Sequence, residues 1–468
     1  DKIKETYTIT QKAKESSLSD IELEGDIKLQ PTKGVASEFQ PGYEIEKTFD
    51  GKIDEGHYHS RWQQEAGFPV TLEYFFDGTQ DLDYIIYYTR SGNGNFGELD
   101  LYTATTDEPE YKLYNSYDFK MQNAASRISF DKSLSKVTKV KFSVKSGLGD
   151  FVSCSEMEFY QKNTDKKLEK QLLTVFTDVT CSELKPDATN EQINNLPGYF
   201  ASLAVQLKND TYDAWEKEFR IRNYEAYSNI NTWADKLMTK HYSSLDNLTG
   251  ISVEQNDEII VLVGDTHGYD VSLQCVGEET TGFLEEKPYV QTAASGDIYY
   301  LEQGVNKITI RNRGQLFIMY NCDLTSKPAP IKIHIPLGSG KVSGFFDLKE
   351  HKTDAKYAEL LSKATDKYFG VKGDKIIFYF HRTKMLEHVR NNILSAIELW
   401  DNIIGWEQEL MGIEDVRPSQ FNNHLFAISP EGSYMWASDY RIAFVYTYLG
   451  NILLYDKPKT MHGDPPTK

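Results

Sequence analysis

The pattern of apolar and polar residues changes three times along the chain. Between residues 29 and 160 the apolar residues form short runs such as VTLEYFF, ELDLYTA and KVKFSV, separated by Gly, Asp, Asn and Ser. Alternation with a period of two, interrupted by turn residues, is typical of antiparallel strands with one buried face. The pattern therefore predicts a β-sandwich of about one domain here.

Helix-forming residues dominate the next segment, residues 162–242. Its first part, QKNTDKKLEKQ, is almost entirely polar and is expected to form an exposed connector. Thr189, followed three residues later by Gln192, has the capping-box pattern that begins a helix. The recurrence of apolar residues on one face predicts a second helix over residues 231–242.

The strand pattern returns between residues 257 and 336, in runs such as DEIIVLVG, NKITIRN, QLFIMYN and PIKIHIP. In the last run, isoleucines at 331, 333 and 335 alternate with Lys332 and His334. This alternation predicts a strand that buries the isoleucines and exposes Lys332 and His334. A second β-sandwich is expected.

After residue 354 predicted helices and strands alternate. We expect a helix near 354–365, a strand at KIIFYFH, and one long helix from Lys384 to Met411 that carries a continuous apolar stripe. The fold class predicted for the whole chain is multidomain, mainly β with an α/β part. The expected divisions are a leader arm (1–28), a β-sandwich (29–161), a helical connector (162–242), a second β-sandwich (243–340) and a partial α/β domain (341–468).

Composition excludes several classes of protein. The 468 residues carry a formal net charge of -19, which disfavours nucleic acid as a partner and favours a monomer. No apolar window is long enough for a transmembrane segment. The four cysteines lie far apart and form no CxxC pair of the kind that holds zinc: Cys154, Cys181, Cys275 and Cys322.

Two segments of the first sandwich have the composition of binding loops: GHYHSRW at residues 56–62 and SGNGNFGEL at residues 91–99. A sugar offers an apolar face to an aromatic ring and hydroxyls to planar polar groups. The predicted carbohydrate site has stacking rings from Tyr58 or Phe96 and hydroxyl ligands from His59, Arg61, Asn93 and Asn95. The alternative is that the aromatic residues cap the core and the Asn/Gly run is only a hairpin turn.

The stretches ASEFQPGYEIEKTFDGKIDEGHYHSRW and CSEMEFY resemble the discoidin family, which is the coagulation factor five/eight type C family. The resemblance covers residues 29–161. It implies a jelly-roll sandwich that binds galactose or amino sugars. It also implies a structural calcium ion held by Asp50 and Glu156, whose oxygens suit a hard cation.

Three later stretches resemble the enhancin-like gluzincin metallopeptidases, which attack mucins and other glycoproteins: EAYSNINTWADKLMTKHYSSLDNLTGISVEQNDEIIVLV, IYYLEQGVNKITIRNRGQLFIMYN and SPEGSYMWASDYRIAF. The resemblance implies zinc as cofactor and an accessory sandwich before a catalytic domain. The candidate substrate-cleft residues are Tyr434, Trp436, Asp439 and Tyr440. Their alternative role is aromatic packing in a buried strand.

The zinc motif of that family, HExxH, occurs nowhere in the sequence. Two histidines one helical turn apart are needed to hold the ion, so this chain alone is predicted to be inactive as a peptidase. We expect the zinc ligands to lie beyond Lys468 in a longer protein.

Two functions fit these observations. The first is the glycan-binding and N-terminal portion of a zinc metallopeptidase that acts on mucin-type glycoproteins. The second is a non-catalytic surface adhesin that binds host glycans. Through the resemblances, either protein is expected to be secreted or held on a bacterial cell surface, for example by a lipid anchor on a removed N-terminal segment.

Overall fold

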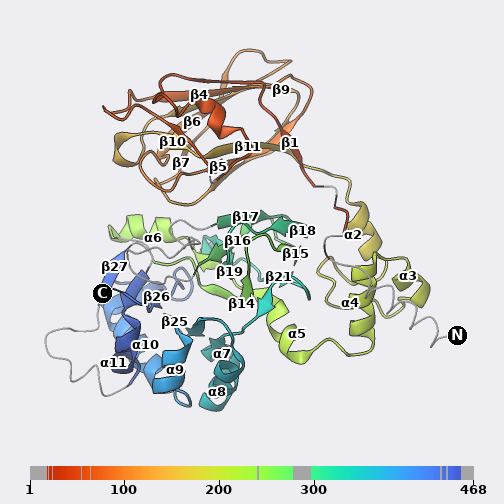
Figure 1. Cartoon of the computed structure of the whole chain (residues 1–468), viewed down its shortest axis with the longest axis vertical. Helices are drawn as coiled ribbons and strands as arrows, with labels where there is room; N and C mark the ends of the chain where they lie inside the picture. Colours follow the sequence, from red (N-terminus) through yellow and green to blue (C-terminus); the bar gives the residue numbers. More distant parts are fainter. Residues whose placement is uncertain are drawn as a thin grey trace. The chain divides into compact units, whose positions relative to one another are not determined.

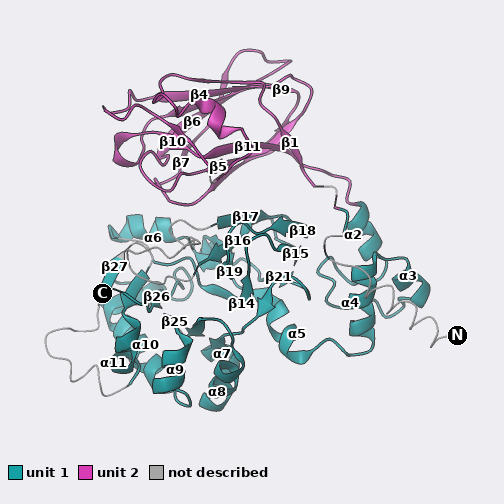
Figure 2. Cartoon of the chain, viewed as in Figure 1, with its two compact units in different colours: residues 1–22, 167–468 teal, residues 23–166 magenta. Residues whose placement is uncertain are grey.

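The chain forms two compact units, shown in different colours in Figure 2: unit 2 spans residues 23–166, and unit 1 comprises residues 1–22 and 167–468. The boundary predicted at residue 161 lies at residue 166. The computed structural model describes residues 18, 21–23, 25–53, 55–63, 65–239, 242–277, 297–432, 435–438 and 441–454. Most of the predicted leader arm lies outside these residues.

Unit 2 is a β-sandwich of two antiparallel sheets. The order of strands is β2-β4-β9-β6-β7 in one sheet and β1-β11-β5-β8 in the other. Along β4 the residues Val70, Leu72 and Tyr74 are buried while the residues between them are partly exposed, as the period of two predicts. The strands are β1 (Ile27–Leu29), β2 (Lys33–Ala36), β3 (Tyr58–His59), β4 (Val70–Phe75), β5 (Leu82–Tyr88), β6 (Glu98–Thr105), β7 (Lys112–Asp118), β8 (Ser126–Leu134), β9 (Val137–Val144), β10 (Ser153–Cys154) and β11 (Glu156–Gln161).

Unit 1 begins with short helices. Thr189 and Gln192 form the predicted capping box at the start of α3, and the chain breaks at Pro197 before α4 begins. The helix predicted over 231–242 is shorter, because Met238 adopts a left-handed conformation that ends α6. The helices are α2 (Lys167–Leu172), α3 (Asn190–Asn194), α4 (Gly198–Lys208), α5 (Ala214–Arg220) and α6 (Ile230–Leu237).

The predicted second sandwich is present in unit 1, with strand orders β12-β21-β15-β18 and β17-β16-β19-β14-β22. These strands are β12 (Ile221–Tyr224), β14 (Asn247–Val253), β15 (Glu258–Val263), β16 (Val271–Val276), β17 (Asp297–Leu301), β18 (Gly304–Thr309), β19 (Gly314–Met319), β21 (Ile331–His334) and β22 (Lys341–Val342). A short parallel pair joins β13 (Tyr227–Ser228) to β20 (Asn321–Cys322).

The expected exposure of His334 on β21 is wrong. His334 is fully buried, with Nδ1 at 2.7 Å from the carbonyl oxygen of Thr180 and Nε2 at 3.0 Å from the hydroxyl of Tyr212. Burial lowers the pKa of His334 to about 4, so the ring is neutral at pH 7. The helical segment covers the second face of the strand, which therefore has two buried faces.

The α/β part of unit 1 has a six-stranded mixed sheet in the order β23-β24-β25-β26-β28-β27, in which β25, β26 and β28 are parallel (Figure 1). Its strands are β23 (Phe346–Asp347), β24 (Tyr368–Lys372), β25 (Ile376–His381), β26 (Leu425–Ile428), β27 (Met435–Ser438) and β28 (Arg441–Phe444). Its helices are α7 (Leu348–His351), α8 (Asp354–Lys363), α9 (Arg382–His388), α10 (Leu394–Leu410) and α11 (Leu449–Leu453).

The single long helix predicted from Lys384 to Met411 is wrong, because the chain breaks between α9 and α10. The carboxylate of Asp354 accepts hydrogen bonds from the backbone N–H groups of Ile393 (2.7 Å) and Leu394 (3.0 Å). A side chain from another helix thus caps the start of α10, a tertiary contact that the apolar stripe does not encode.

Candidate functional site

Aromatic and histidine side chains gather on the loops of unit 2. We call this group the aromatic cluster: Tyr43, His57, His59, Trp62 and Phe151. Ring centroids lie 4.7 Å apart for Tyr43 and Trp62, and 5.4 Å apart for His59 and Phe151. Trp62 is 47% exposed, so the cluster presents an apolar ring to solvent.

Both histidines of the aromatic cluster are neutral at pH 7. Burial, followed by the nearby charge of Arg90, lowers the pKa of His57 to about 4. Burial also lowers the pKa of His59. The Nδ1 of His59 lies 2.7 Å from the carbonyl oxygen of Ser60, which only accepts hydrogen bonds. Nδ1 therefore carries the proton, and Nε2 of His59 is left as an acceptor.

Asn93 lies beside this cluster. A side chain at Gly149 would meet the Oδ1 of Asn93 at 2.9 Å and the ring of Phe151 at 3.6 Å, so the two residues flank this glycine. Gly149 has a positive φ of 68°, which places the loop close to Asn93 without a side chain between them. Asn93 and Arg61 are both exposed.

The stacking role predicted for Tyr58 and Phe96 is wrong, because both rings are fully buried. The hydroxyl of Tyr58 donates to the carbonyl of Glu38 at 2.6 Å. Phe96 stacks on Tyr87 in the core, with ring centroids 4.0 Å apart. Neither ring can offer a face to a sugar.

Asn95 is also fully buried, so its predicted contact with a sugar hydroxyl is wrong. Its Oδ1 accepts hydrogen bonds from the hydroxyl of Thr89 (2.9 Å) and the N–H of Gly92, and its Nδ2 donates to Asn123 (2.6 Å). Asn95 thus holds the loop together from inside, which agrees with the alternative interpretation of the Asn/Gly run as a structural turn.

Sequence reasoning missed five residues of this surface: Tyr43, His57, Trp62, Arg90 and Phe151. His57 and Trp62 lie in the quoted GHYHSRW, and Arg90 directly precedes the quoted SGNGNFGEL, so these three had a local signal. Phe151 is brought to His59 only by the fold, and nothing in its own sequence neighbourhood marks it.

The residues expected to hold calcium differ in environment. Glu156 is fully buried; its Oε1 accepts the N–H of Gly51 at 2.9 Å and lies 3.7 Å from Nζ of Lys28, and its Oε2 has no hydrogen-bond partner among the described residues. Burial raises the pKa of Glu156 to about 7. Asp50 is exposed and accepts the N–H of Lys52. Among the described residues no group of three or more His, Cys, Asp or Glu is arranged to hold a metal, so backbone oxygens would have to complete such a site.

In unit 1, Trp436 lies on β27, the last strand of the six-stranded sheet. Within the described part of the chain β27 pairs only with β28, which leaves one backbone edge open. The guanidinium of Arg441 lies 4.7 Å from the ring of Trp436, which is partly buried. The other candidate cleft residues, Tyr434, Asp439 and Tyr440, lie outside the residues that the structure describes.

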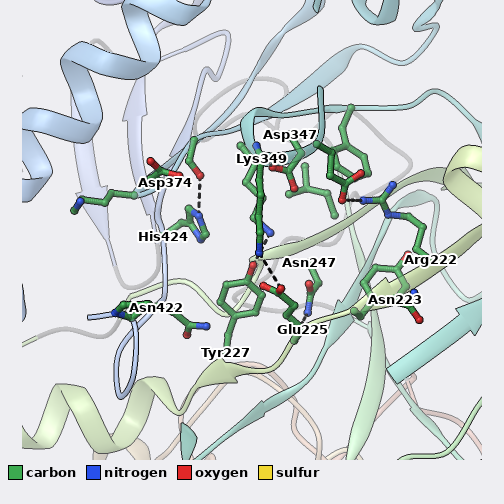
Figure 3. A pocket seen from close by; sticks show the side chains of 18 of the residues that line it. Arg222, Asn223, Glu225, Tyr227, Asn247, Asp347, Lys349, Asp374, Asn422 and His424 are labelled. Atoms are coloured by element: carbon green, nitrogen blue, oxygen red, sulfur yellow. Dashed lines mark hydrogen bonds and ion pairs between the residues drawn. The ribbon is translucent and has the colours of Figure 1, made fainter. Parts of the chain in front are cut away.

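Unit 1 also has a polar cavity of about 730 Å³, with lysines, arginines and carboxylates in its wall (Figure 3). Its lining comes from β12, β13, the start of α7, the turn between β24 and β25, and residues 422–424. No motif or periodic pattern in the sequence marks this cavity.

None of the helices in the described residues is long and apolar enough to cross a membrane. No family model matches the sequence, and no curated protein matches it either. Solved structures do match. A metallopeptidase from Bacteroides thetaiotaomicron is 67% identical over 64% of this chain and 50% of that chain, with a TM-score of 0.60.

Two further structures superpose with TM-scores below 0.5. A metallopeptidase in complex with Tn antigen is 71% identical over 52% of this chain and 44% of that chain, with a TM-score of 0.49. The CBM32-1, CBM32-2 and M60 catalytic domains of ZmpB from Clostridium perfringens are 19% identical over 91% of this chain and 47% of theirs, with a TM-score of 0.47. The chain spans about half the length of the Bacteroides thetaiotaomicron metallopeptidase. The expected similarity to metallopeptidases is therefore confirmed by the Bacteroides structure.

Proposed function

We propose that this chain is the glycan-binding and N-terminal portion of a secreted or surface zinc metallopeptidase, of the enhancin-like type, that acts on mucin-type glycoproteins. The observation that carries the proposal is the 67% identity to the Bacteroides metallopeptidase over 64% of this chain. Identity at this level over several hundred residues accompanies a common fold, and supports a common reaction class when the whole proteins are compared.

Unit 2 supplies the glycan-binding part of this proposal, as a discoidin-like module. Trp62 and Tyr43 give an exposed aromatic surface for the apolar face of a galactose-type sugar. The guanidinium of Arg90, an exposed residue, donates to a hydroxyl oxygen. His59 is only 3% exposed, so its proposed role is to support the rings of Trp62 and Phe151 and not to bind a hydroxyl directly. Arg61 and Asn93 are proposed as further hydroxyl ligands from the same loops.

The unpartnered Oε2 of Glu156 supports a calcium ion next to the turn at Gly51. A buried carboxylate oxygen without a hydrogen-bond donor destabilises the folded state. A bound hard cation would offset this destabilisation. Asp50, one residue before Gly51, is proposed as the second acidic ligand.

Binding of the substrate protein is assigned to unit 1. The open edge of β27 is suited to pairing with an extended peptide by main-chain hydrogen bonds, with Trp436 beside it. Zinc is proposed as the cofactor because the chain is similar to a metallopeptidase. The ion would act as a Lewis acid on the scissile carbonyl. Its HExxH ligands are not in the printed sequence.

The glycan-binding part is tested by applying the 468-residue chain to immobilised mucin glycopeptides and to the same peptides after removal of their O-glycans. We expect binding only to the glycosylated form, and a loss of about tenfold in affinity on Trp62→Ala. Leu113→Ala is the matched control, because Leu113 is also exposed but lies on β7. Equal binding to both peptides would overturn this part.

The peptidase part is tested with the product of the complete gene, incubated with a mucin glycoprotein with and without a zinc chelator. Cleavage that the chelator abolishes supports the proposal. Binding without cleavage would overturn the peptidase and favour the adhesin.

A further inference from the structure

The cavity in unit 1 has no role in the proposed function. It lies where the second sandwich meets the α/β sheet, and Figure 3 shows charged side chains from both parts pointing toward one another across it. Its volume of about 730 Å³ falls in the range of small-molecule sites. Its wall is polar, so a polar ligand suits it better than an apolar one.

Lys372, the last residue of β24, differs from the other lysines of this wall. Its Nζ donates a hydrogen bond to the hydroxyl of Tyr227 at 2.5 Å, and no carboxylate of the described residues lies within ion-pair distance of it. The other two lysines and one arginine have carboxylate partners: Lys349 with Glu225 (2.9 Å), Lys375 with Glu414 (3.3 Å) and Arg222 with Glu350 (2.5 Å). The guanidinium of Arg417 donates instead to the backbone carbonyls of Asn423 (3.1 Å) and Asp374 (2.6 Å).

The ammonium of Lys372 is charged at neutral pH. Burial lowers its pKa, but Tyr227 and the negative charge of Asp347 outweigh burial and leave the pKa above the ordinary value. Burial raises the pKa of Tyr227, so its phenol stays neutral and does not neutralise the lysine. A partly buried cation with one neutral partner has two further N–H groups to donate to an anion.

Contacts with the side chains of His424 and Asp401 fix the turn that follows Lys372. The carbonyl of Gly373 lies 3.0 Å from Nε2 of His424. The carboxylate of Asp401 accepts the N–H groups of Asp374 (2.9 Å), Lys375 (2.8 Å) and Ile376 (3.0 Å). Because these anchors fix the backbone beside Lys372, the ammonium is positioned before any ligand arrives, which reduces the entropy lost on binding.

Hydrogen-bond acceptors line the same cavity. Glu225 and Asp347 each accept a hydrogen bond from Lys349, from its Nζ and its backbone N–H respectively, and keep further lone pairs. Asn247 donates its Nδ2 to the carbonyl of Glu225 at 2.9 Å, which leaves its Oδ1 to accept. A lysine without a carboxylate partner, together with acceptors that keep lone pairs, suits a molecule with one carboxylate and several hydroxyls.

We propose that this cavity binds an acidic monosaccharide unit, a hexuronate, with its carboxylate against the ammonium of Lys372 and its hydroxyls on Glu225, Asp347 and Asn247. The inference concerns residues of unit 1 alone. It does not depend on the proposed peptidase activity or on the aromatic cluster of unit 2.

Glucuronate and glucose differ only in the carboxylate, so they are the matched probes. We expect isothermal titration of the 468-residue chain at low ionic strength to show binding of sodium glucuronate and much weaker binding of glucose. Lys372→Met should lower the affinity for glucuronate about tenfold or more, and Tyr227→Phe by a smaller factor. Lys363→Met is the control, since Lys363 is an exposed lysine on α8 paired with Glu359.

Four results would overturn the proposal: no binding of glucuronate at millimolar concentration, equal affinity for glucose and glucuronate, competition by acetate as strong as that by glucuronate, or wild-type affinity in Lys372→Met. The third result would mean a simple anion site. If Lys372→Met fails to fold, Tyr227→Phe and the comparison of the two sugars decide the question.

Discussion

The carboxylate oxygen Oδ1 of Asp246 contacts His424 twice, at 2.7 Å from its backbone nitrogen and at 2.8 Å from its ring Nδ1. Both side chains are buried. The second ring nitrogen of His424 faces the carbonyl of Gly373, another acceptor. The ring of His424 therefore joins Asp246, just before β14, to the turn between β24 and β25.

We expect His424→Ala to destabilise unit 1 by about 2–3 kcal/mol, because it removes a buried ring and its contacts with Asp246 and Gly373. Urea denaturation followed by tryptophan fluorescence measures the loss. The exposed histidine His267, replaced by alanine, is the control and should change stability by less than about 0.5 kcal/mol. Equal effects of the two variants would show that the buried contacts of His424 do not stabilise unit 1.

Glu156 should make the stability of unit 2 fall as the pH rises. Its pKa is about 7 in the folded state and about 4.3 in an unfolded chain, so between these values the folded state binds more protons. The free energy of unfolding should therefore decrease by about 2–3 kcal/mol from pH 4.5 to pH 8. Glu156→Gln, which cannot ionise, should remove most of this slope in denaturant titrations without added calcium. A wild-type slope in the variant would show that Glu156 does not cause it.

Calcium should oppose this effect of pH. A cation needs the ionised carboxylate, so millimolar calcium should raise the thermal midpoint of unit 2 by several degrees at pH 8 and by much less at pH 5. The shift should vanish in Glu156→Gln and be small with magnesium, which prefers a smaller octahedral site. Calorimetry that shows the same shift in the variant would place the ion elsewhere.

Glycan binding by unit 2 should not depend on a charged histidine at pH 7 and above. Burial lowers the pKa of His57 to about 4 and also lowers the pKa of His59, so both rings are neutral between pH 7 and pH 8. Affinity for galactose-type sugars, measured by titration across this range, should therefore be constant. Arg90→Ala should lower the affinity about tenfold, because it removes a charged hydrogen-bond donor. A fall in wild-type affinity between pH 8 and pH 7 would contradict the neutral rings.

Phe96 is expected to act on stability and not on sugar binding. Phe96→Ala removes a fully buried ring that stacks on Tyr87, and should cost about 3–5 kcal/mol. Phe96→Leu keeps much of the volume and should cost less. Thermal unfolding measures both variants. The folded Phe96→Leu protein should bind glycans as the wild type does. A loss of glycan affinity without a loss of stability would show that Phe96 belongs to the binding site.

Regular patterns of the sequence were reliable where neighbouring residues decide the structure. The period of two along β4 and the capping box at Thr189 depend on residues close in the chain, and both are present. The long helix after Lys384 was mispredicted because its interruption depends on Asp354, which lies on another helix. Local periodicity carries no information about such a cap.

The site was less predictable than the fold. Sequence reasoning chose both Tyr58 and His59, which are neighbours in β3. The ring of Tyr58 is buried in the core, and the side chain of His59, which packs against Phe151, is only 3% exposed. Successive residues of a strand point to opposite faces, and the sequence did not say that both faces of β3 are covered. Phe151 and the charge of Arg90 reach His59 only through the packing of loops distant in sequence.

The sequence by itself determined the order of β and α/β segments, the acidic charge and the absence of an HExxH motif in the chain. Only the tertiary structure decided that His334 is buried, that Tyr58 and Phe96 belong to the core, and that Lys372 lies in a cavity with no ion-paired carboxylate from the described residues. The physical reason is that periodicity and turn residues act over a few positions. Burial, charge pairing and cavities, in contrast, arise from segments that meet only when the chain is folded.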